Sequence, residues 1–209
     1  MAGRVTSYIG LGANLGDAPR TLAAAANALR AMPDARLASV SRLYVTRPVG
    51  VVEQPDFHNA AVRLEVPTGP DPETGALALL SALKQLEGAF GRRMGERWGP
   101  RELDLDLLLF GAHRIHVARP EGARSEDATR AGVQWLDVPH ASAQERLFVL
   151  APLADLSPDL VPPGWEESIR SACLRGVERE GAGAIRAIAH WDLQRAGWSP
   201  ARGVGTAES

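Results

Sequence analysis

The chain lacks the features that mark secreted, membrane-spanning and nucleic-acid-binding proteins. It has one cysteine in 209 residues, which excludes an internal disulfide framework and favours a reducing compartment. Its first residues lack the apolar centre of a signal peptide, and no apolar run approaches the length of a membrane span. The formal net charge of −2 gives no overall basic field. We therefore expect a cytoplasmic protein that binds neither nucleic acid nor membranes, while no pattern indicates its oligomeric state.

What the chain does have is the composition of an ordinary globular domain, with 45% hydrophobic and 23% charged residues. Apolar periodicity predicts two helices, one following Asp17 and one following residues 67–73. The predicted strands cover residues 5–11, 40–46, 59–66 and 103–110. The order strand, helix, strand, strand, helix, strand predicts an α+β fold of the ferredoxin-like split βαβ type. Such a sandwich has an antiparallel sheet with helices packed on one face.

The second half of the chain carries weaker patterns. Residues 119–134 are polar and aperiodic, so we expect a loop insertion there. Residues 146–153 have a helical apolar pattern, and extra C-terminal elements follow. We expect a single domain over residues 1–175 and a C-terminal extension over 176–209, whose end is rich in small residues and predicted to be disordered.

Two carboxylates stand out in the leucine-rich stretch RELDLDLLLF. Asp104 and Asp106 are two residues apart in a period-2 pattern, which puts both on one face of a strand, next to Leu108 and Phe110. An acid pair on an apolar strand is costly to bury unless its charge is compensated. Mg²⁺ would compensate it and would bring phosphate oxygens to the site. The structural alternative is a solvent-facing acid pair that forms ion pairs with Arg97 or Arg101.

A basic, glycine-punctuated segment precedes these acids. Its arginines could bind a triphosphate through forked hydrogen bonds, or could be solvated as most basic clusters are. The glycines suggest a loop that closes on a ligand. Trp98 could stack on a base or anchor the loop. The arginines are Arg92, Arg93, Arg97 and Arg101.

Several isolated residues could complete a site for a flat ligand. Phe57 and Phe148 could sandwich a planar ring, although single aromatic residues more often belong to a core. Asn59 offers both a donor and an acceptor to a heterocycle edge. His140 could donate to a phosphate or cap the helix that follows.

Five segments, taken in order, resemble hydroxymethyl-dihydropterin pyrophosphokinase of folate biosynthesis. They are SYIGLGANLGD, SRLYVTRPVG, QPDFHNAAVRLEV, RRMGERWGPRELDLDLLLFG and VPHASAQERLFVLAPLADLSPDLVPP. RWGPRELDLD is the most specific part of a resemblance that covers roughly residues 5–165. The resemblance implies a ferredoxin-like catalytic domain that transfers pyrophosphate from ATP to the dihydropterin hydroxymethyl group and releases AMP.

The resemblance also implies roles for residues at matched positions. Asp104 and Asp106 would hold two Mg²⁺ ions, and either Asp106 or an oxygen on the metal would take the hydroxyl proton. The catalytic set would be Arg92, Arg93, Arg97, Arg101 and Asp106. The nucleotide would meet Glu87, Arg93, Trp98, Leu107, His140 and Arg146. The pterin would meet Thr46, Val49, Phe57, Asn59 and Phe148.

Two other functions use the same acid pair. A metal-dependent phosphohydrolase or nucleotidyltransferase would turn over ATP without a pterin. A non-catalytic nucleotide-binding module would bind ATP without turnover. Neither needs Phe57, Asn59 and Phe148, which favour the pyrophosphokinase.

Overall fold

The fold was analysed in a computed structural model, which describes residues 3–48, 54–91, 102–118 and 135–200. The predictions for Val49, the arginine segment 92–101, the insertion 119–134 and the tail 201–209 lie outside the described residues.

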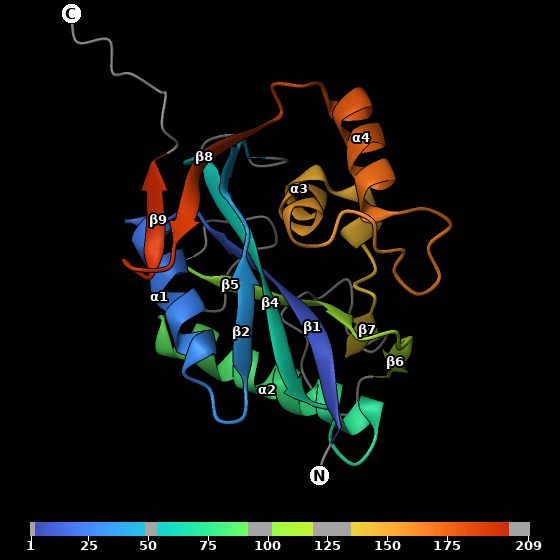
Figure 1. The fold of residues 1–209 in the computed structure, drawn as a ribbon. Coiled ribbons are helices and arrows are strands. Elements are labelled where there is room, and N and C mark those ends of the chain that lie inside the picture. The colour runs from blue at the N-terminus through green and yellow to red at the C-terminus, as the bar shows by residue number, and fades with distance from the viewer. Residues whose placement is uncertain (1–2, 49–53, 92–101, 119–134, 201–209) are drawn as a thin grey trace, which may run out of the picture.

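An antiparallel sheet of seven strands forms the centre of the described chain (Figure 1). The strand order is β5-β1-β4-β3-β8-β9, and β2 also pairs with β4. Two short strands, β6 and β7, form a separate sheet. The strands are β1 (Arg4–Ala13), β2 (Arg36–Val40), β3 (Leu43–Thr46), β4 (Phe57–Pro67), β5 (Asp104–Phe110), β6 (Ile115–Val117), β7 (Leu136–Val138), β8 (Ile185–Asp192) and β9 (Gly197–Pro200).

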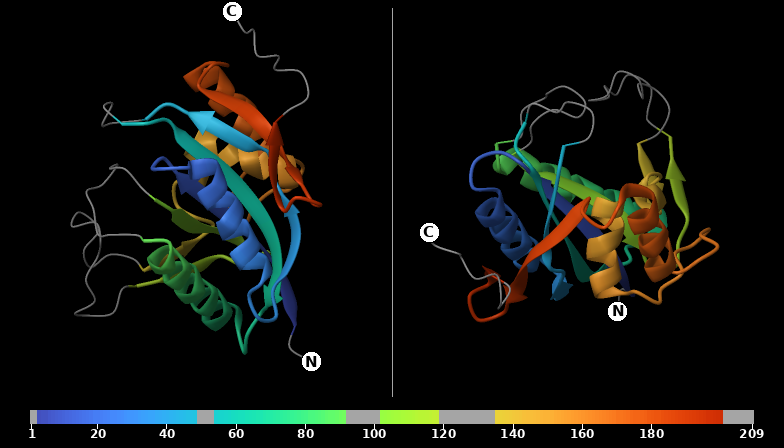
Figure 2. Two further views of the ribbon diagram at one scale, coloured as in Figure 1. Left: turned by 90° about the vertical axis from the view of Figure 1, so that its left-hand side faces the viewer. Right: turned by 90° about the horizontal axis from the view of Figure 1, so that it is seen from above.

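Helices pack on both faces of the sheet, whereas the sequence predicted helices on one face only. Helices α1 (Ala18–Arg30) and α2 (Pro72–Ala89) cover one face, which we call the first face. Helix α3 (Leu147–Leu156) lies on the opposite, second face against β4, β3 and β1, and α4 (Ile169–Glu180) packs on α3 (Figures 1 and 2). A short 3-10 helix, η2 (Ala143–Glu145), precedes α3.

Both faces need cover because β1 and β5 carry large buried side chains on each. Ile9 and Leu105 belong to the core under α1 and α2. Tyr8 and Leu108 belong to a smaller core with Leu153 of α3. Burying apolar area on both faces removes it from water, which is the main favourable contribution to folding.

The predicted strand 40–46 is divided in two at Ser41 and Arg42. The Ser41 hydroxyl accepts a hydrogen bond from the backbone N–H of Ala61, 2.9 Å away. The Ser41 backbone carbonyl accepts one from the Trp198 indole at 3.0 Å. A side-chain oxygen thus supports the interruption between β2 and β3, which period-2 patterning does not reveal.

The C-terminal segment extends the main sheet. Strand β8 pairs antiparallel with β3, and β9 pairs with β8. The boundary expected after residue 175 falls inside α4. Within the described ranges, no helix combines the length and the apolar character needed to cross a membrane.

Candidate active site

The acid pair lies on the second face of the sheet. Leu103, Leu105 and Leu107 are buried in the core under α1 and α2. The alternating residues Asp104 and Asp106 therefore project to the other face, where both are half-buried. β5 is an edge strand of the main sheet, so the pair lies at the edge of this face.

A bulge changes the direction of the last residues of β5. Ile9 of β1 pairs with Leu107, yet its neighbour Tyr8 pairs with Leu109, so Leu108 is an extra residue on β5. Leu108 and Leu109 consequently both join the core under α3, and Phe110 returns to the opposite core. The prediction that Phe110 shares the face of the acids is therefore wrong, because strict alternation stops at the bulge.

One row of paired residues crosses the sheet from the acids to a buried amide. Asp104 pairs with Gly12, Gly12 pairs with Asn59, and Asn59 pairs with Tyr44. A Cβ placed on Gly12 would lie 3.7 Å from the Asn59 Oδ1 and 4.0 Å from the Asp104 Cβ. Because Gly12 has no side chain, no Cβ lies between the Asp104 and Asn59 side chains on this face. A glycine inside a strand is a signal of close approach that the sequence analysis did not use.

The amide of Asn59 is held by its neighbours on β3 and β4. Its Nδ2 donates to the Thr46 hydroxyl at 3.0 Å, and the residue is 5% exposed. Thr46 pairs with Phe57, so these two residues and Asn59 lie on the second face together. Three of the residues predicted for the pterin thus converge. Phe148 lies half-buried on α3, the helix that covers the same face.

Glu87 and Leu107 have environments that the sequence did not indicate. The Glu87 carboxylate is 1% exposed and accepts a hydrogen bond from the Leu105 backbone N–H at 2.7 Å. It also accepts from the Lys84 ammonium at 3.0 Å. Glu87 therefore ties α2 to β5 at the residue between the two acids. The Leu107 side chain is buried in the core, so any nucleotide contact from this residue would involve its backbone.

The remaining described candidates lie between β7 and α3. The backbone N–H of His140 donates to the Leu108 carbonyl at 2.9 Å, which joins this segment to the bulge of β5. His140 Nδ1 accepts from the Ser142 N–H at 3.4 Å. The Arg146 guanidinium lies over the Phe148 ring, 5.6 Å from its centre. The helix that carries Phe148 is thus preceded by a cation in contact with that ring.

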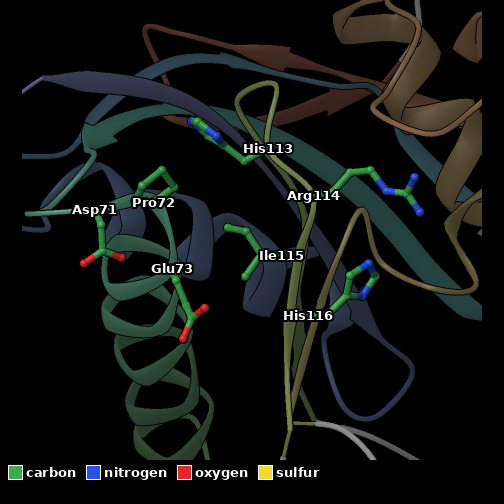
Figure 3. A pocket seen from close by; sticks show the side chains of 7 residues that line it. All are labelled: Asp71, Pro72, Glu73, His113, Arg114, Ile115 and His116. Carbon is green, nitrogen blue, oxygen red and sulfur yellow. The ribbon is translucent and has the colours of Figure 1, made fainter.

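A separate hollow lies between the first turn of α2 and β6 (Figure 3). Figure 3 shows the Arg114 and His116 side chains turned away from the Asp71 and Glu73 carboxylates. His116 bonds instead to Asp137 at 2.7 Å. None of the predicted site residues lines this hollow, so it is not the candidate site.

The acid pair suits magnesium. In the described part of the chain, no group of three or more His, Cys, Asp or Glu side chains is placed to form an all-protein metal cage. Mg²⁺ is usually held by one or two carboxylates together with substrate phosphates and water. Two carboxylates on one face of an edge strand match that requirement.

The fold and site define an α+β protein with a carboxylate pair, a buried amide and an aromatic residue on one face of its sheet. The family model of 7,8-dihydro-6-hydroxymethylpterin-pyrophosphokinase (HPPK) matches residues 8–158. The chain belongs to this family, and it is therefore a transferase of folate biosynthesis.

Curated relatives agree with this assignment. The chain is 39% identical over 175 residues to the 2-amino-4-hydroxy-6-hydroxymethyldihydropteridine pyrophosphokinase of Pseudomonas aeruginosa, covering 82% of this chain and 94% of that protein. It is 37% identical over 177 residues to the enzyme of the same name from Methylorubrum extorquens, covering 83% and 97%.

Solved structures support the fold. A crystal structure of Plasmodium falciparum HPPK-DHPS A437G with SDX-DHP superimposes with a TM-score of 0.70 at 14% identity, covering 96% of this chain. The chain spans about half of that longer protein, 51% of its length.

Proposed function

We propose that this protein transfers the pyrophosphoryl group of ATP to the hydroxyl of 6-hydroxymethyl-7,8-dihydropterin and releases AMP, with Mg²⁺ as the metal. The observation that carries the proposal is the row on the second face, where Asp104, Gly12 and Asn59 lie side by side on neighbouring strands. A metal–phosphate site and a heterocycle site would then be adjacent, as pyrophosphoryl transfer between two bound substrates requires.

In this proposal the pterin lies between Phe57 and Phe148, and Asn59 reads its polar edge. The bond from Asn59 Nδ2 to Thr46 fixes the amide orientation, so the ligand meets a preorganised group. The backbone around Thr46 and Val49 would complete the edge. A buried polar group that is matched by the ligand rejects analogues lacking the partner atom.

Asp104 and Asp106 would hold two Mg²⁺ ions, and these would supply positive charge to compensate the phosphates. The strand backbone makes both side chains project from the same face of β5. Asp106 is one candidate to accept the proton of the pterin hydroxyl. The protein itself then contributes position and electrostatic stabilisation.

The nucleotide would lie along the outer edge of β5, against the Leu107 backbone, His140 and Arg146. Glu87 is buried, so it would act on the nucleotide only through its bond to the Leu105 N–H. The segment with Arg92, Arg93, Arg97, Trp98 and Arg101 would cover the phosphates and the base. We further propose a ferredoxin-like core made of β1, α1, β2/β3, β4, α2 and β5, because their sheet order matches that arrangement.

We also propose that residues 1–175 form the catalytic domain, extended by 176–209, and that the enzyme works in the cytoplasm on small-molecule substrates without nucleic acid or membrane partners.

Product analysis tests the proposal. The purified protein is incubated with ATP, Mg²⁺ and the dihydropterin, and the nucleotides are separated by chromatography. AMP should form together with the pterin pyrophosphate, and omission of the pterin or addition of a chelator should stop both. Formation of ADP alone, or of AMP without pterin, would contradict the proposal. Asp106→Ala serves as the inactive control.

A further inference from the structure

An ion-pair network at the far end of α3 joins this helix to β3. Asp155, the penultimate residue of α3, bonds the Arg42 guanidinium through both carboxylate oxygens, with Nη2 to Oδ1 at 2.6 Å. The Arg42 backbone N–H adds a bond to Oδ2 at 3.0 Å. The Tyr44 hydroxyl donates to the same oxygen at 2.9 Å. One carboxylate thus accepts hydrogen bonds from a guanidinium, a backbone N–H and a phenol.

The carboxylate and the phenol of the network are shielded from water, while the Arg42 side chain is 55% exposed. The Asp155 side chain is 15% exposed, and Tyr44 is 5% exposed. Burial and the Asp155 charge raise the pKa of Tyr44, so its hydroxyl keeps the proton that it donates. The Arg42 guanidinium also lies over the Tyr44 ring at 5.4 Å. The bidentate geometry of the Arg–carboxylate pair, with its carboxylate largely shielded from water, restricts the orientation of the two side chains.

The network connects two elements that carry proposed pterin residues: the β3–β4 pair through Tyr44, and α3 through Asp155. Tyr44 is the cross-strand partner of Asn59 and is two residues before Thr46 on the same face. On α3, Phe148 is seven residues before Asp155, which corresponds to roughly two turns, about 10 Å along one side of the helix. Phe148 and Asp155 therefore project from the same side of α3.

A second bond limits rotation of α3 at this end. The Tyr8 hydroxyl and the Ser157 hydroxyl are 2.6 Å apart, and Tyr8 comes from β1. The helix has only ten residues and contains Pro152. A short helix with a proline inside makes fewer backbone bonds of its own, so its position depends on tertiary contacts.

We infer that Asp155, through Arg42 and Tyr44, is a positioning residue for the pterin: it sets the spacing between Phe148 on α3 and the Thr46–Asn59 pair on the sheet. The inference rests on the proposed function. Among the described residues, the hydrogen bonds that Asp155 accepts from Arg42 and Tyr44 do not involve β5, so the network acts directly on the pterin side of the site. Its effect on the nucleotide side is indirect, through Arg146 next to Phe148.

Steady-state kinetics with each substrate in turn separates this role from a general structural one. The KM for the dihydropterin is measured at saturating ATP and Mg²⁺, and the KM for ATP at saturating dihydropterin. Asp155→Asn should raise the pterin KM by about 10-fold or more, because it weakens every bond that the carboxylate accepts, and Tyr44→Phe by about 3-fold, because it removes only one of them. The KM for ATP should stay within about 2-fold in both variants.

Two further variants act as controls. Asp155→Glu keeps the carboxylate and should retain a pterin KM close to that of the wild type. Asp159→Asn removes an Arg–Asp pair of similar chemistry, the pair with Arg170 at 3.1 Å, whose side chains are exposed. It should leave both KM values unchanged. Circular dichroism confirms that each variant is folded.

The outcomes are decisive. Wild-type protein that forms no AMP from ATP and the dihydropterin contradicts the proposed function itself. If the wild type is active, an unchanged pterin KM in Tyr44→Phe and Asp155→Asn overturns the inference alone. An equal rise of both KM values, or an Asp155→Glu enzyme as weak as Asp155→Asn, also overturns it. Tyr44→Phe removes one hydroxyl only, so the test holds if Asp155→Asn does not fold.

Discussion

Replacing Glu87 by alanine should destabilise the protein and disturb the acid pair at the same time. The Glu87 carboxylate is buried and accepts the Leu105 N–H at 2.7 Å. Loss of a hydrogen bond to a charged acceptor costs about 1.5–3 kcal/mol of folding free energy. The upper half of that range applies here, because the Leu105 N–H would stay buried without an acceptor. The Lys84 pair adds little, because the Lys84 side chain is 42% exposed.

We therefore expect Glu87→Ala to lower the free energy of unfolding by about 2–3 kcal/mol. For a chain of this size that corresponds to a fall in Tm of about 4–12 °C. Glu87→Gln retains an oxygen acceptor without the charge and should lose about half as much. Because Leu105 lies between Asp104 and Asp106, activity should also fall and should require more Mg²⁺.

Thermal denaturation followed by circular dichroism measures the stability change, and a Mg²⁺ titration of AMP formation measures the effect on the acids. The matched control is Glu178→Ala, which removes an exposed helical glutamate and should change stability by less than about 0.5 kcal/mol. A Tm for Glu87→Ala within about 2 °C of the wild type would refute the argument that this carboxylate anchors β5.

Three further predictions concern other parts of the molecule. Asp106→Ala should lower turnover by orders of magnitude with little loss of folding stability, since two like charges no longer repel each other; marked unfolding would favour a structural role. Hydrogen bonds from the Thr74 backbone N–H and hydroxyl lower the pKa of Asp71 in the folded state. The ionised Asp71 therefore stabilises the folded state above the unfolded pKa, about 4, and this stabilisation is lost as the pH falls further. Asp71→Ala should flatten the acid side of a Tm-versus-pH curve. An unaltered curve would contradict this. Trp198→Phe removes the indole bond to the Ser41 carbonyl and should cost about 1 kcal/mol in urea unfolding; no change in the midpoint would show that this bond does not support the strand break.

Local patterns account for much of the fold. The alternation of leucines with Asp104 and Asp106 placed both acids on one face of a strand, and the structure has them there. The predicted helix start at Asp17 is confirmed, because its carboxylate accepts a bond from the first turn of α1. Asp71 caps α2 in the same way, although the sequence analysis had not singled it out. These features depend on spacing along the chain, which is why they can be read without the structure.

Other features depend on residues far apart in the sequence. The bulge at Leu108 is a shift in register between β5 and β1, and the periodicity of β5 alone does not predict it. The cover of the second face by α3 depends on contacts between segments about a hundred residues apart, such as Arg42 with Asp155. The addition of β8 to the edge strand β3 was likewise missed, because pairing partners are chosen in space.

The amino-acid sequence by itself determined the order of the elements, the shared face of the acid pair and the family resemblance, because each is expressed in short-range spacing or in a continuous motif. Only the tertiary structure decided that Asn59 lies across Gly12 from Asp104, that Glu87 bonds α2 to β5, and that Asp155 bonds α3 to Arg42 and Tyr44. Those contacts form when segments far apart in the sequence bury their apolar faces against each other. Packing of those faces determines which side chains meet, and spacing within one segment does not specify it.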